Sequence, residues 1–240
     1  MKNIDIAVVG KDVGINNAYS NVDKALKLAA SFNNIDINIH YIDSHGLNES
    51  NVDSILKGYN GILIPGGFNY DGVEGMILAI SYARNNNIPF FGICLGMQLT
   101  VIEYARNVAN LPLATSSEFD PTSSYKVVDH LPNLKEGLRE GTFKCLLKEG
   151  SLISKCYQLL SINETFRHCY SFNSDYKELL QNKGLVISAY SNNEQYLEAV
   201  ELNDHPFFLG VQFHPELSSP DKPHPLFLGF IEAAFKNRKE

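Results

Sequence analysis

The sequence predicts an α/β fold, in which a doubly wound, mostly parallel sheet is flanked by helices. Short, fully apolar runs such as Gly61–Ile64 and Ile88–Ile93 are typical of buried parallel strands. Segments with apolar residues at helical spacing alternate with these runs, which implies right-handed crossovers between parallel strands. No repeat, linker or low-complexity stretch interrupts the chain, so we expect one domain over residues 1–240.

The first half of the chain contains four predicted strands: Ile4–Gly10, Ile35–Ile42, Gly61–Ile64 and Ile88–Ile93. The helix after the first strand is predicted from one apolar face, formed by Val22, Ala25, Leu26, Ala29 and Phe32. A short helix is expected near Val52–Leu56. Two further helices are predicted from the sets Val73, Ile77, Ile80, Ala83 and Leu95, Leu99, Ile102, Ala105.

The second half is less regular. Ser116–Pro121 is predicted to be a turn-rich loop, and the charged stretch Lys135–Lys144 a loop or an edge segment. Strands are expected at Gly184–Ser188, Tyr196–Leu202 and Pro206–Phe213. Within the second of these, alternation of Leu197 and Ala199 with Glu198 and Glu201 indicates a partly exposed antiparallel pair. A final helix has an apolar face made of Leu226, Phe227, Phe230, Ile231 and Ala234.

Composition and charge exclude several classes of function. The net charge is −7, and the only basic run is Lys236–Lys239, so no nucleic-acid partner is expected. No apolar stretch approaches the roughly 20 residues that span a bilayer, and Met1–Asp5 opens a strand rather than a signal peptide, so no membrane association is expected. The four cysteines have no metal-type spacing, and Pro65-Gly66-Gly67 lacks the Lys-Ser/Thr of a phosphate-binding loop. We therefore expect a reduced, cytoplasmic protein without metal or cofactor.

Cys94 lies where a predicted buried strand changes into a helix, with glycines two residues before and after it. Such glycines allow the sharp bend and close backbone approach of a nucleophile elbow. The helix dipole favours the thiolate form of a cysteine at a helix N-terminus. A buried core cysteine is the alternative, since that is the commonest environment of this residue.

A second polar segment, Gln212–Glu216, follows the apolar strand Phe207–Phe213. On an extended chain, residues two apart point the same way, so Glu216 can hold the His214 imidazole while its other nitrogen faces the thiol. This arrangement predicts a catalytic triad of Cys94, His214 and Glu216. The backbone N–H groups of Gly67 and Leu95 are the expected oxyanion hole. Alone, His214 would be read as a structural histidine, but Cys94 and the Pro65–Gly67 turn also lie at strand ends.

Five short segments resemble the class I glutamine amidotransferase domain of CTP synthase, and the likeness covers essentially the whole chain. They are Pro65–Phe68, Gly72–Gly75, Gly92–Gln98, Glu118–Asp120 and Gln212–Glu216. The resemblance implies a flavodoxin-like three-layer fold and hydrolysis of glutamine through a γ-glutamyl thioester on Cys94. It also implies that Gly67, Leu95, Gln98 and Glu118 bind the substrate, with Glu118 on its α-ammonium group.

The sequence departs from that family in three ways. The synthetase domain that uses the ammonia is absent from this sequence, so a synthetase partner that accepts ammonia or an amine is a further expectation. Cys169 stands where the family has an arginine that binds glutamine, and loss of that charged pair would cost about 1.5–3 kcal/mol. The lid segment is replaced by the shorter Gly137–Phe143, so activation by GTP is not expected.

These observations favour a cysteine-dependent amidohydrolase acting on glutamine or another γ-glutamyl amide. The complete triad supports this function. The alternative is a catalytically weak or partner-activated binding or regulatory homologue, which Cys169 and the altered lid favour. A Cys169→Arg variant separates a single missing contact from a wider loss of function, because it should raise glutaminase activity only in the first case.

Overall fold

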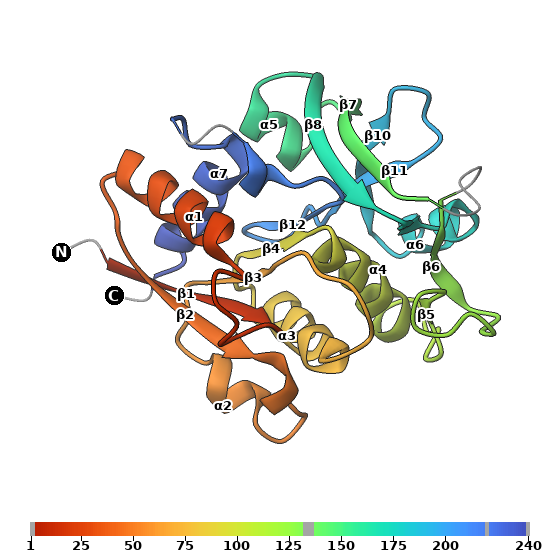
Figure 1. Ribbon diagram of the computed structural model, residues 1–240, viewed down its shortest axis with the longest axis horizontal. Coiled ribbons are helices and arrows are strands. Elements are labelled where there is room, and N and C mark those ends of the chain that lie inside the picture. Colours follow the sequence, from red (N-terminus) through yellow and green to blue (C-terminus); the bar gives the residue numbers. More distant parts are fainter. Residues whose placement is uncertain (1–2, 132–136, 219–220, 239–240) are drawn as a thin grey trace.

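The computed structural model describes residues 3–131, 137–218 and 221–238. Within these ranges the chain forms a nine-stranded sheet, a separate three-stranded sheet, and helices on both faces of the large sheet (Figure 1). Parts of three sequence predictions lie outside the described residues: Met1–Lys2 of the opening strand, Lys135–Glu136 of the charged stretch, and Lys239 of the basic run.

One half of the large sheet is parallel, as the sequence predicts. Its strands lie in the order β2-β1-β3-β4-β12. Their bounds are β1 Asn3–Gly10, β2 Asp36–Asp43, β3 Gly61–Ile64, β4 Phe90–Ile93 and β12 Phe208–Val211. β3, β4 and β12 are buried along their whole length because helices cover both faces of the sheet. Because β3, β4 and β12 are parallel neighbours, their carboxyl ends lie at the same edge of the sheet.

The other half of the sheet is antiparallel and continues from β12 in the order β11-β10-β7-β8. These strands are β11 Leu197–Glu201, β10 Val186–Ser191, β7 Arg139–Leu147 and β8 Ser161–His168. The described part of Lys135–Lys144, predicted to be a loop or an edge segment, enters a strand at Arg139, where β7 begins. Over Arg139–Lys144 this strand pairs only with β8, as an edge segment does, and β10 joins its other side from Cys145 to Leu147. The small sheet has the order β5-β6-β9, with β5 Thr115–Ser116, β6 Lys126–His130 and β9 Tyr170–Phe172.

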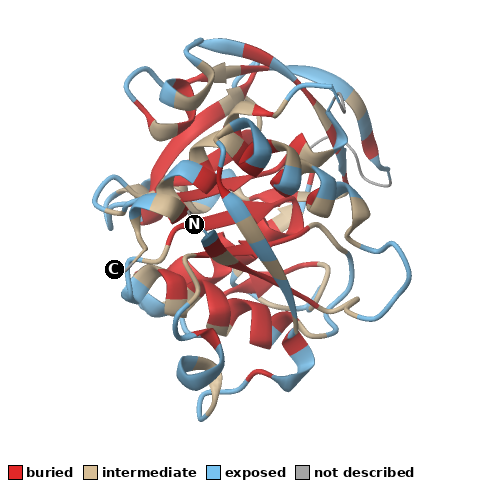
Figure 2. Cartoon of the chain, turned by 90° about the vertical axis from the view of Figure 1, so that its left-hand side faces the viewer, coloured by how far each residue is buried: buried red, intermediate tan, exposed pale blue. Residues whose placement is uncertain are grey.

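Helices cover the large sheet in two layers, and the buried residues run through its centre (Figure 2). α1 (Ser20–Phe32), α5 (Leu152–Tyr157) and α7 (Pro225–Lys236) pack on one face. α2 (Val52–Leu56), α3 (Val73–Asn85), α4 (Leu95–Asn107) and the short α6 (Lys177–Gln181) pack on the other. The apolar face predicted for α7 is buried in full.

Two burial predictions are wrong. Phe32 is 66% exposed, because it is the last residue of α1, and Ala30 is buried in its place. Glu198 and Glu201 are not on an exposed face but are 0% and 1% exposed. Both carboxylates have partners from distant segments. Glu198 pairs with Arg139 at 2.8 Å, and Glu201 accepts hydrogen bonds from the N–H groups of Leu152 and Ile153 at the start of α5.

Candidate active site

Three adjacent strand ends bring the predicted site residues together. Ile64 of β3 is in register with Gly92 of β4, and Ile93 of β4 with Val211 of β12. The N–H of Cys94 donates to the carbonyl of Val211 (2.7 Å), so the thiol and the segment that carries His214 leave the sheet side by side. This is the edge at which parallel α/β sheets bind ligands.

The backbone at Cys94 makes the sharp turn that the sequence predicts. Cys94 has φ 52° and ψ −101°, a conformation that costs energy for a residue with a side chain, and it directly precedes α4. The flanking glycines permit this turn. A Cβ at Gly92 would lie 2.8 Å from the carbonyl carbon and oxygen of Gly96, and a Cβ at Gly96 would lie 2.4 Å from the carbonyl oxygen of Ile64.

His214 lies between Glu216 and Cys94. Its Nδ1 is 2.7 Å from Oε1 of Glu216, and the side chains are 13% and 9% exposed. Burial lowers the pKa of His214, but the neighbouring Cys94 and Glu216 side chains outweigh this effect, so the pKa is raised overall. Glu216 reaches the ring differently from the prediction. Residues Pro215–Leu217 form a 3-10 turn rather than an extended strand, and this turn brings the carboxylate back to Nδ1.

The two residues predicted for the oxyanion hole are neighbours. A Cβ at Gly67 would lie 3.2 Å from Cδ2 of Leu95. Leu95 is the first residue of α4, so its N–H is one of the four at the start of a helix that have no intrahelical acceptor. A Cβ at Gly66 would lie 3.0 Å from Cε1 of His214 and 3.6 Å from Cβ of Cys94, so the Pro65–Gly67 turn borders both side chains.

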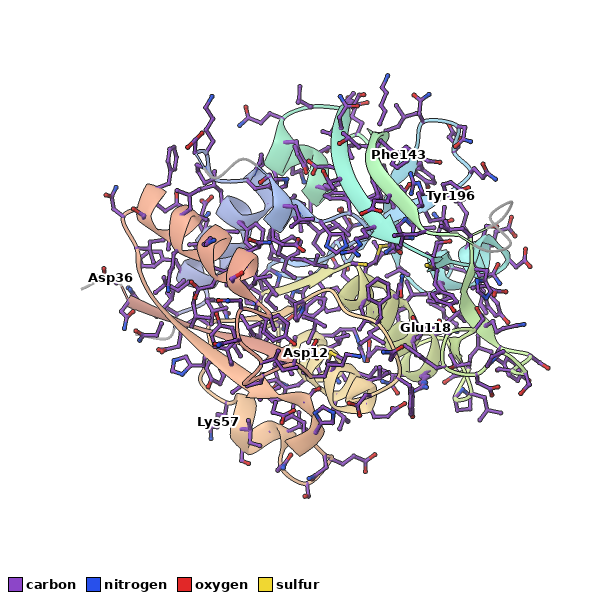
Figure 3. All side chains as sticks on the ribbon, in the orientation of Figure 1. Asp12, Asp36, Lys57, Glu118, Phe143 and Tyr196 are labelled. Atoms are coloured by element: carbon purple, nitrogen blue, oxygen red, sulfur yellow. The ribbon has the colours of Figure 1, made fainter. Side chains whose placement is uncertain are left out.

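The predicted substrate-binding residues Glu118 and Gln98 already have protein partners. Glu118, on the loop between β5 and β6 (Figure 3), accepts a 2.7 Å hydrogen bond from the N–H of Asn69 in the loop that follows the glycine turn. Burial raises the pKa of Glu118, although Asn69, Lys11 and His130 act in the opposite direction. Gln98 is 4% exposed, and its Nε2 donates to the carbonyl of Tyr170 (2.9 Å) and to Oε1 of Gln212 (3.2 Å).

Cys169 connects β8 and β9 next to this site. Its pKa is raised by burial and by the charges of Glu118 and Cys94. Arg167, two residues before Cys169 on β8, faces Glu140. Its side chain is 60% exposed and lies 3.6 Å from Glu140 on β7, while its carbonyl is 3.9 Å from Sγ of Cys94.

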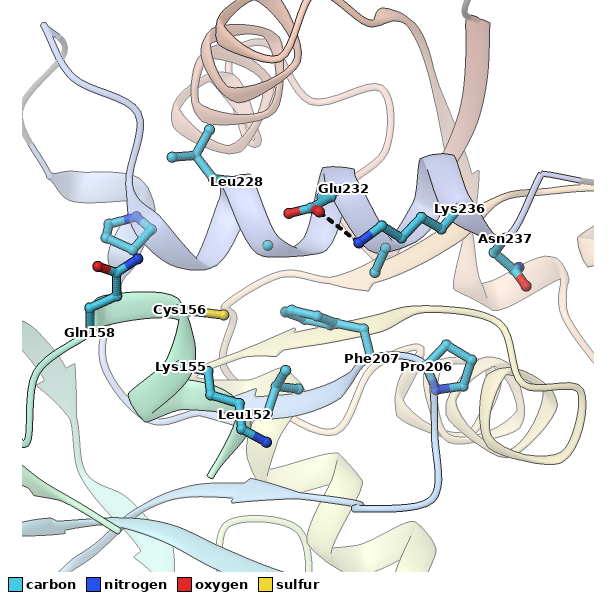
Figure 4. Close-up of a pocket in the computed structure, with 13 residues that line it drawn as sticks. Leu152, Lys155, Cys156, Gln158, Pro206, Phe207, Leu228, Glu232, Lys236 and Asn237 are labelled. Carbon is cyan, nitrogen blue, oxygen red and sulfur yellow. Dashed lines mark hydrogen bonds and ion pairs between the residues drawn. The ribbon is translucent and has the colours of Figure 1, made fainter. Parts of the chain in front are cut away.

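Cavities are found near both ends of β12. One of about 230 Å³ is lined by Gly66, Gly67, Arg167, His214 and Glu216, among others. A larger cavity of about 600 Å³ lies between α5, α7 and the start of β12, and includes Cys156 and Phe207 (Figure 4). Since Phe207 precedes β12 and His214 follows it, the larger cavity is at the opposite end of that strand from Cys94.

The described part of the chain contains no group of three or more His, Cys, Asp or Glu residues that could hold a metal. No helix among the described residues has the length and apolar character needed to cross a membrane.

Fold and site together bring a cysteine, a histidine and a glutamate to one edge of an α/β sheet. A family model of glutamine amidotransferase class-I matches residues 15–233, and the chain belongs to this family.

Its relatives include CTP synthases. That of Caldanaerobacter subterraneus subsp. tengcongensis is 46% identical over 237 residues, which are 96% of this chain and 44% of the relative. That of Staphylococcus aureus is 46% identical over 240 residues, 97% of this chain and 45% of the relative. The chain thus spans less than half the length of these relatives.

Among solved structures, the CTPS glutaminase domain of Trypanosoma brucei with bound acivicin has a TM-score of 0.91 and 36% identity, covering 97% of this chain and 94% of that one. A glutamine amidotransferase from Thermotoga maritima, 14% identical over 99% of this chain and 99% of that one with a TM-score of 0.59, shares the fold.

Sequence reasoning missed the side chains behind the sulfur. Gln212 is 0% exposed, and its Nε2 lies 3.6 Å from Sγ of Cys94. The sequence did contain a signal, since Gln212 is the one polar residue in the predicted apolar run Phe207–Phe213. A buried amide needs hydrogen-bond partners, so this residue was a candidate for a specific contact.

Proposed function

We propose that this chain hydrolyses the γ-amide of glutamine or of a related γ-glutamyl amide through a thioester on Cys94. The observation that carries the proposal is the convergence of Cys94, His214 and Glu216 at one sheet edge, beside the Gly67–Leu95 pair. The bound acivicin in the solved relative supports it as well.

In this reaction the Cys94 thiolate attacks the γ-carbonyl carbon, and the negative charge develops on the carbonyl oxygen. The N–H groups of Gly67 and Leu95 are the proposed donors to that oxygen. Protonated His214, oriented by Glu216, gives its proton to the leaving amine as the C–N bond breaks. Water then attacks the thioester while His214 takes a proton, and the thiolate leaves with release of the acid.

We propose that two residues bind the amino-acid end of the substrate. Glu118 binds the α-ammonium group. Gln98 contributes Oε1, because its Nε2 already donates to Tyr170 and Gln212. All four cysteines are free in the structure, which supports a reduced, cytoplasmic setting for the working thiol. We further propose a synthetase partner that accepts the released ammonia or amine, because the relatives are CTP synthases more than twice as long as the matched segment.

The test is incubation of the purified chain with glutamine and a small panel of γ-glutamyl amides. Release of ammonia or amine is measured, with Cys94→Ala as the inactive control. We expect release from at least one compound, absent in the control. No release from any compound, even though Cys94 reacts with an electrophilic glutamine analogue, would contradict hydrolysis by the isolated chain.

The second candidate function is a partner-activated or regulatory homologue with weak turnover, and Cys169 is the observation that favours it. A Cys169→Arg variant decides how much this position matters. If only the contact to the substrate carboxylate is missing, the arginine should lower KM for glutamine roughly tenfold or more, the value of a charge-assisted hydrogen bond. Cys169→Ala is the uncharged control. Equal kinetics of the two variants would contradict the explanation that only one contact is missing.

A further inference from the structure

A chain of buried hydrogen bonds leads from the sulfur of Cys94 to the backbone of β9. Nε2 of Gln212 donates to Sγ of Cys94 (3.6 Å), and Oε1 of Gln212 accepts from Nε2 of Gln98 (3.2 Å). The same Nε2 of Gln98 also donates to the carbonyl of Tyr170 (2.9 Å). Both glutamine side chains are buried, so the protein rather than solvent determines how their amides are turned.

The direction of every bond in this chain follows from its end at Tyr170. A backbone carbonyl can only accept, so Gln98 must present its NH₂ group there. The second hydrogen of that NH₂ group points to Gln212, which must therefore turn its oxygen toward Gln98. The NH₂ group of Gln212 is then left facing the sulfur, so a donor and not an acceptor meets Cys94.

The carbonyl of Tyr170 is itself held in place. Nδ1 of His168 lies 2.7 Å from it, and Nε2 of His168 lies 3.2 Å from Nη1 of Arg139. Since arginine can only donate, Nε2 accepts and Nδ1 carries the proton that goes to Tyr170. Burial lowers the pKa of His168 to about 3, which agrees with a neutral ring.

Arg139 is fixed from several sides. Nη1 of Arg139 lies 2.8 Å from Oε1 of Glu198, and its guanidinium lies over the rings of Phe143, Phe166 and Tyr196 at 4.6, 4.2 and 4.8 Å. Phe143 lies in β7 and Tyr196 directly precedes β11, both in the antiparallel part of the molecule (Figure 3). The hydrogen bonds behind Cys94 are thus anchored in the antiparallel half of the sheet, whereas Cys94 and His214 follow strands of the parallel half.

We infer that Gln212 is a catalytic residue whose amide N–H stabilises the Cys94 thiolate, and that Gln98 is a positioning residue that keeps this donor facing the sulfur. The inference rests on Cys94 being the nucleophile of the proposed function. A hydrogen bond to the anionic sulfur favours the thiolate before attack and again when the thioester C–S bond breaks. A neutral donor does this while the proton of His214 stays available for the leaving amine.

The test is the pH profile of Cys94 alkylation by iodoacetamide, followed at the Cys94 peptide by mass spectrometry, alongside kcat and KM for the best substrate. In Gln212→Leu the midpoint of alkylation should move to higher pH by about one unit, and kcat at neutral pH should fall about tenfold, with KM nearly unchanged. Gln98→Leu should move the midpoint in the same direction but less. Without Gln98, the Gln212 amide can turn either its oxygen or its NH₂ group to the sulfur, so the donor is lost only part of the time. The double variant should match Gln212→Leu.

Tyr104→Phe is the matched control. It removes one buried hydrogen bond of the same helix, from the Tyr104 hydroxyl to the carbonyl of Lys183 (2.7 Å), and should leave the alkylation profile unchanged. An unchanged midpoint in Gln212→Leu, or a loss of thermal stability and kcat without a shift of midpoint, would overturn the inference. Additive shifts in the double variant would overturn the role of Gln98. If Gln212→Leu does not fold, Gln98→Leu decides.

Alkylation is measured without substrate. A wild-type chain that hydrolyses nothing would therefore contradict the proposed function, whereas the shifts would still show that Gln212 stabilises the Cys94 thiolate.

Discussion

At the scale of single residues, the site depends on which partner each polar atom has. His214 is buried, and burial lowers its pKa, yet Glu216 and Cys94 raise it further than burial lowers it. The protonated ring is therefore the stable form at neutral pH. That is the form needed to protonate a leaving amine, so the Glu216 contact should determine how far activity extends into alkaline pH.

The Glu216→Gln variant tests this role. Without the carboxylate, one of the two groups that raise the pKa of His214 is lost, while burial still lowers it, so the pKa of the ring falls. The alkaline limb of the kcat/KM profile should then move to lower pH, by about one unit or more, since one unit corresponds to about 1.4 kcal/mol of lost interaction. Glu232→Gln, which removes the exposed partner of Lys236 on α7, should leave the profile unaltered. An unmoved alkaline limb in Glu216→Gln would mean that the limb reports another group.

Sequence patterns predicted the triad and the oxyanion pair as neighbours because each residue ends a strand whose apolar run is readable locally. Gln212, Gln98 and the Tyr170 carbonyl were beyond that method. Their arrangement depends on contacts between β12, α4 and β9, and no short stretch of sequence encodes which way a buried amide is turned. Roles for Cys94, His214, Glu216 and Glu118 stay predictions until the variants are measured.

At the scale of elements, the approach of α4 to β3 creates the turn at Cys94. Gly96 lies in the first turn of α4, where its Cα faces the carbonyl of Ile64 at the end of β3. Backbone atoms are on both sides of this contact, so neither side can move away by a change of rotamer. Any added side chain must separate the helix from the strand.

Gly96→Ala should therefore lower the free energy of unfolding by about 2 kcal/mol or more, the usual range for overpacking a tight core. It should also slow alkylation of Cys94, because the thiol moves with the start of α4. Urea unfolding and the alkylation rate measure the two effects. Gly46→Ala is the control, since a Cβ there has no neighbour within 4 Å and the backbone needs no positive φ. Equal stability of the two variants would show that α4 can shift at little cost.

Sequence patterns missed β7 and β8. Both strands contain several polar and charged residues and few consecutive apolar ones, so they read locally as a solvated loop. Burial of Glu198 depends on Arg139 from another strand, and burial of Glu201 depends on the start of α5. β3, β4 and β12 were predicted well because they contain only apolar residues and glycine.

At the scale of the whole molecule, two halves of one sheet have different construction. The parallel half carries Cys94 and His214, and the antiparallel half carries Arg139 and Glu198. They are joined by the β11–β12 ladder and by the contact between the rings of Phe166 and Phe213, whose centroids are 5.7 Å apart. The hydrogen-bond chain behind Cys94 crosses the same junction, so the site needs both halves in register.

The prediction of one domain over residues 1–240 can be tested through this junction. Phe230 in α7 and Phe166 in β8 are both 0% exposed and lie in different halves. Each Phe→Ala change should lower the free energy of unfolding by about 3–5 kcal/mol. If the chain is one cooperative unit, both variants shift a single transition. Far-UV circular dichroism and tyrosine fluorescence, usable because the sequence has no tryptophan, should then coincide. Two transitions, with each variant moving only one, would show that the halves unfold separately. The continuous β12–β11 pairing leaves no exposed linker at which such a separation would begin, and this favours the single transition.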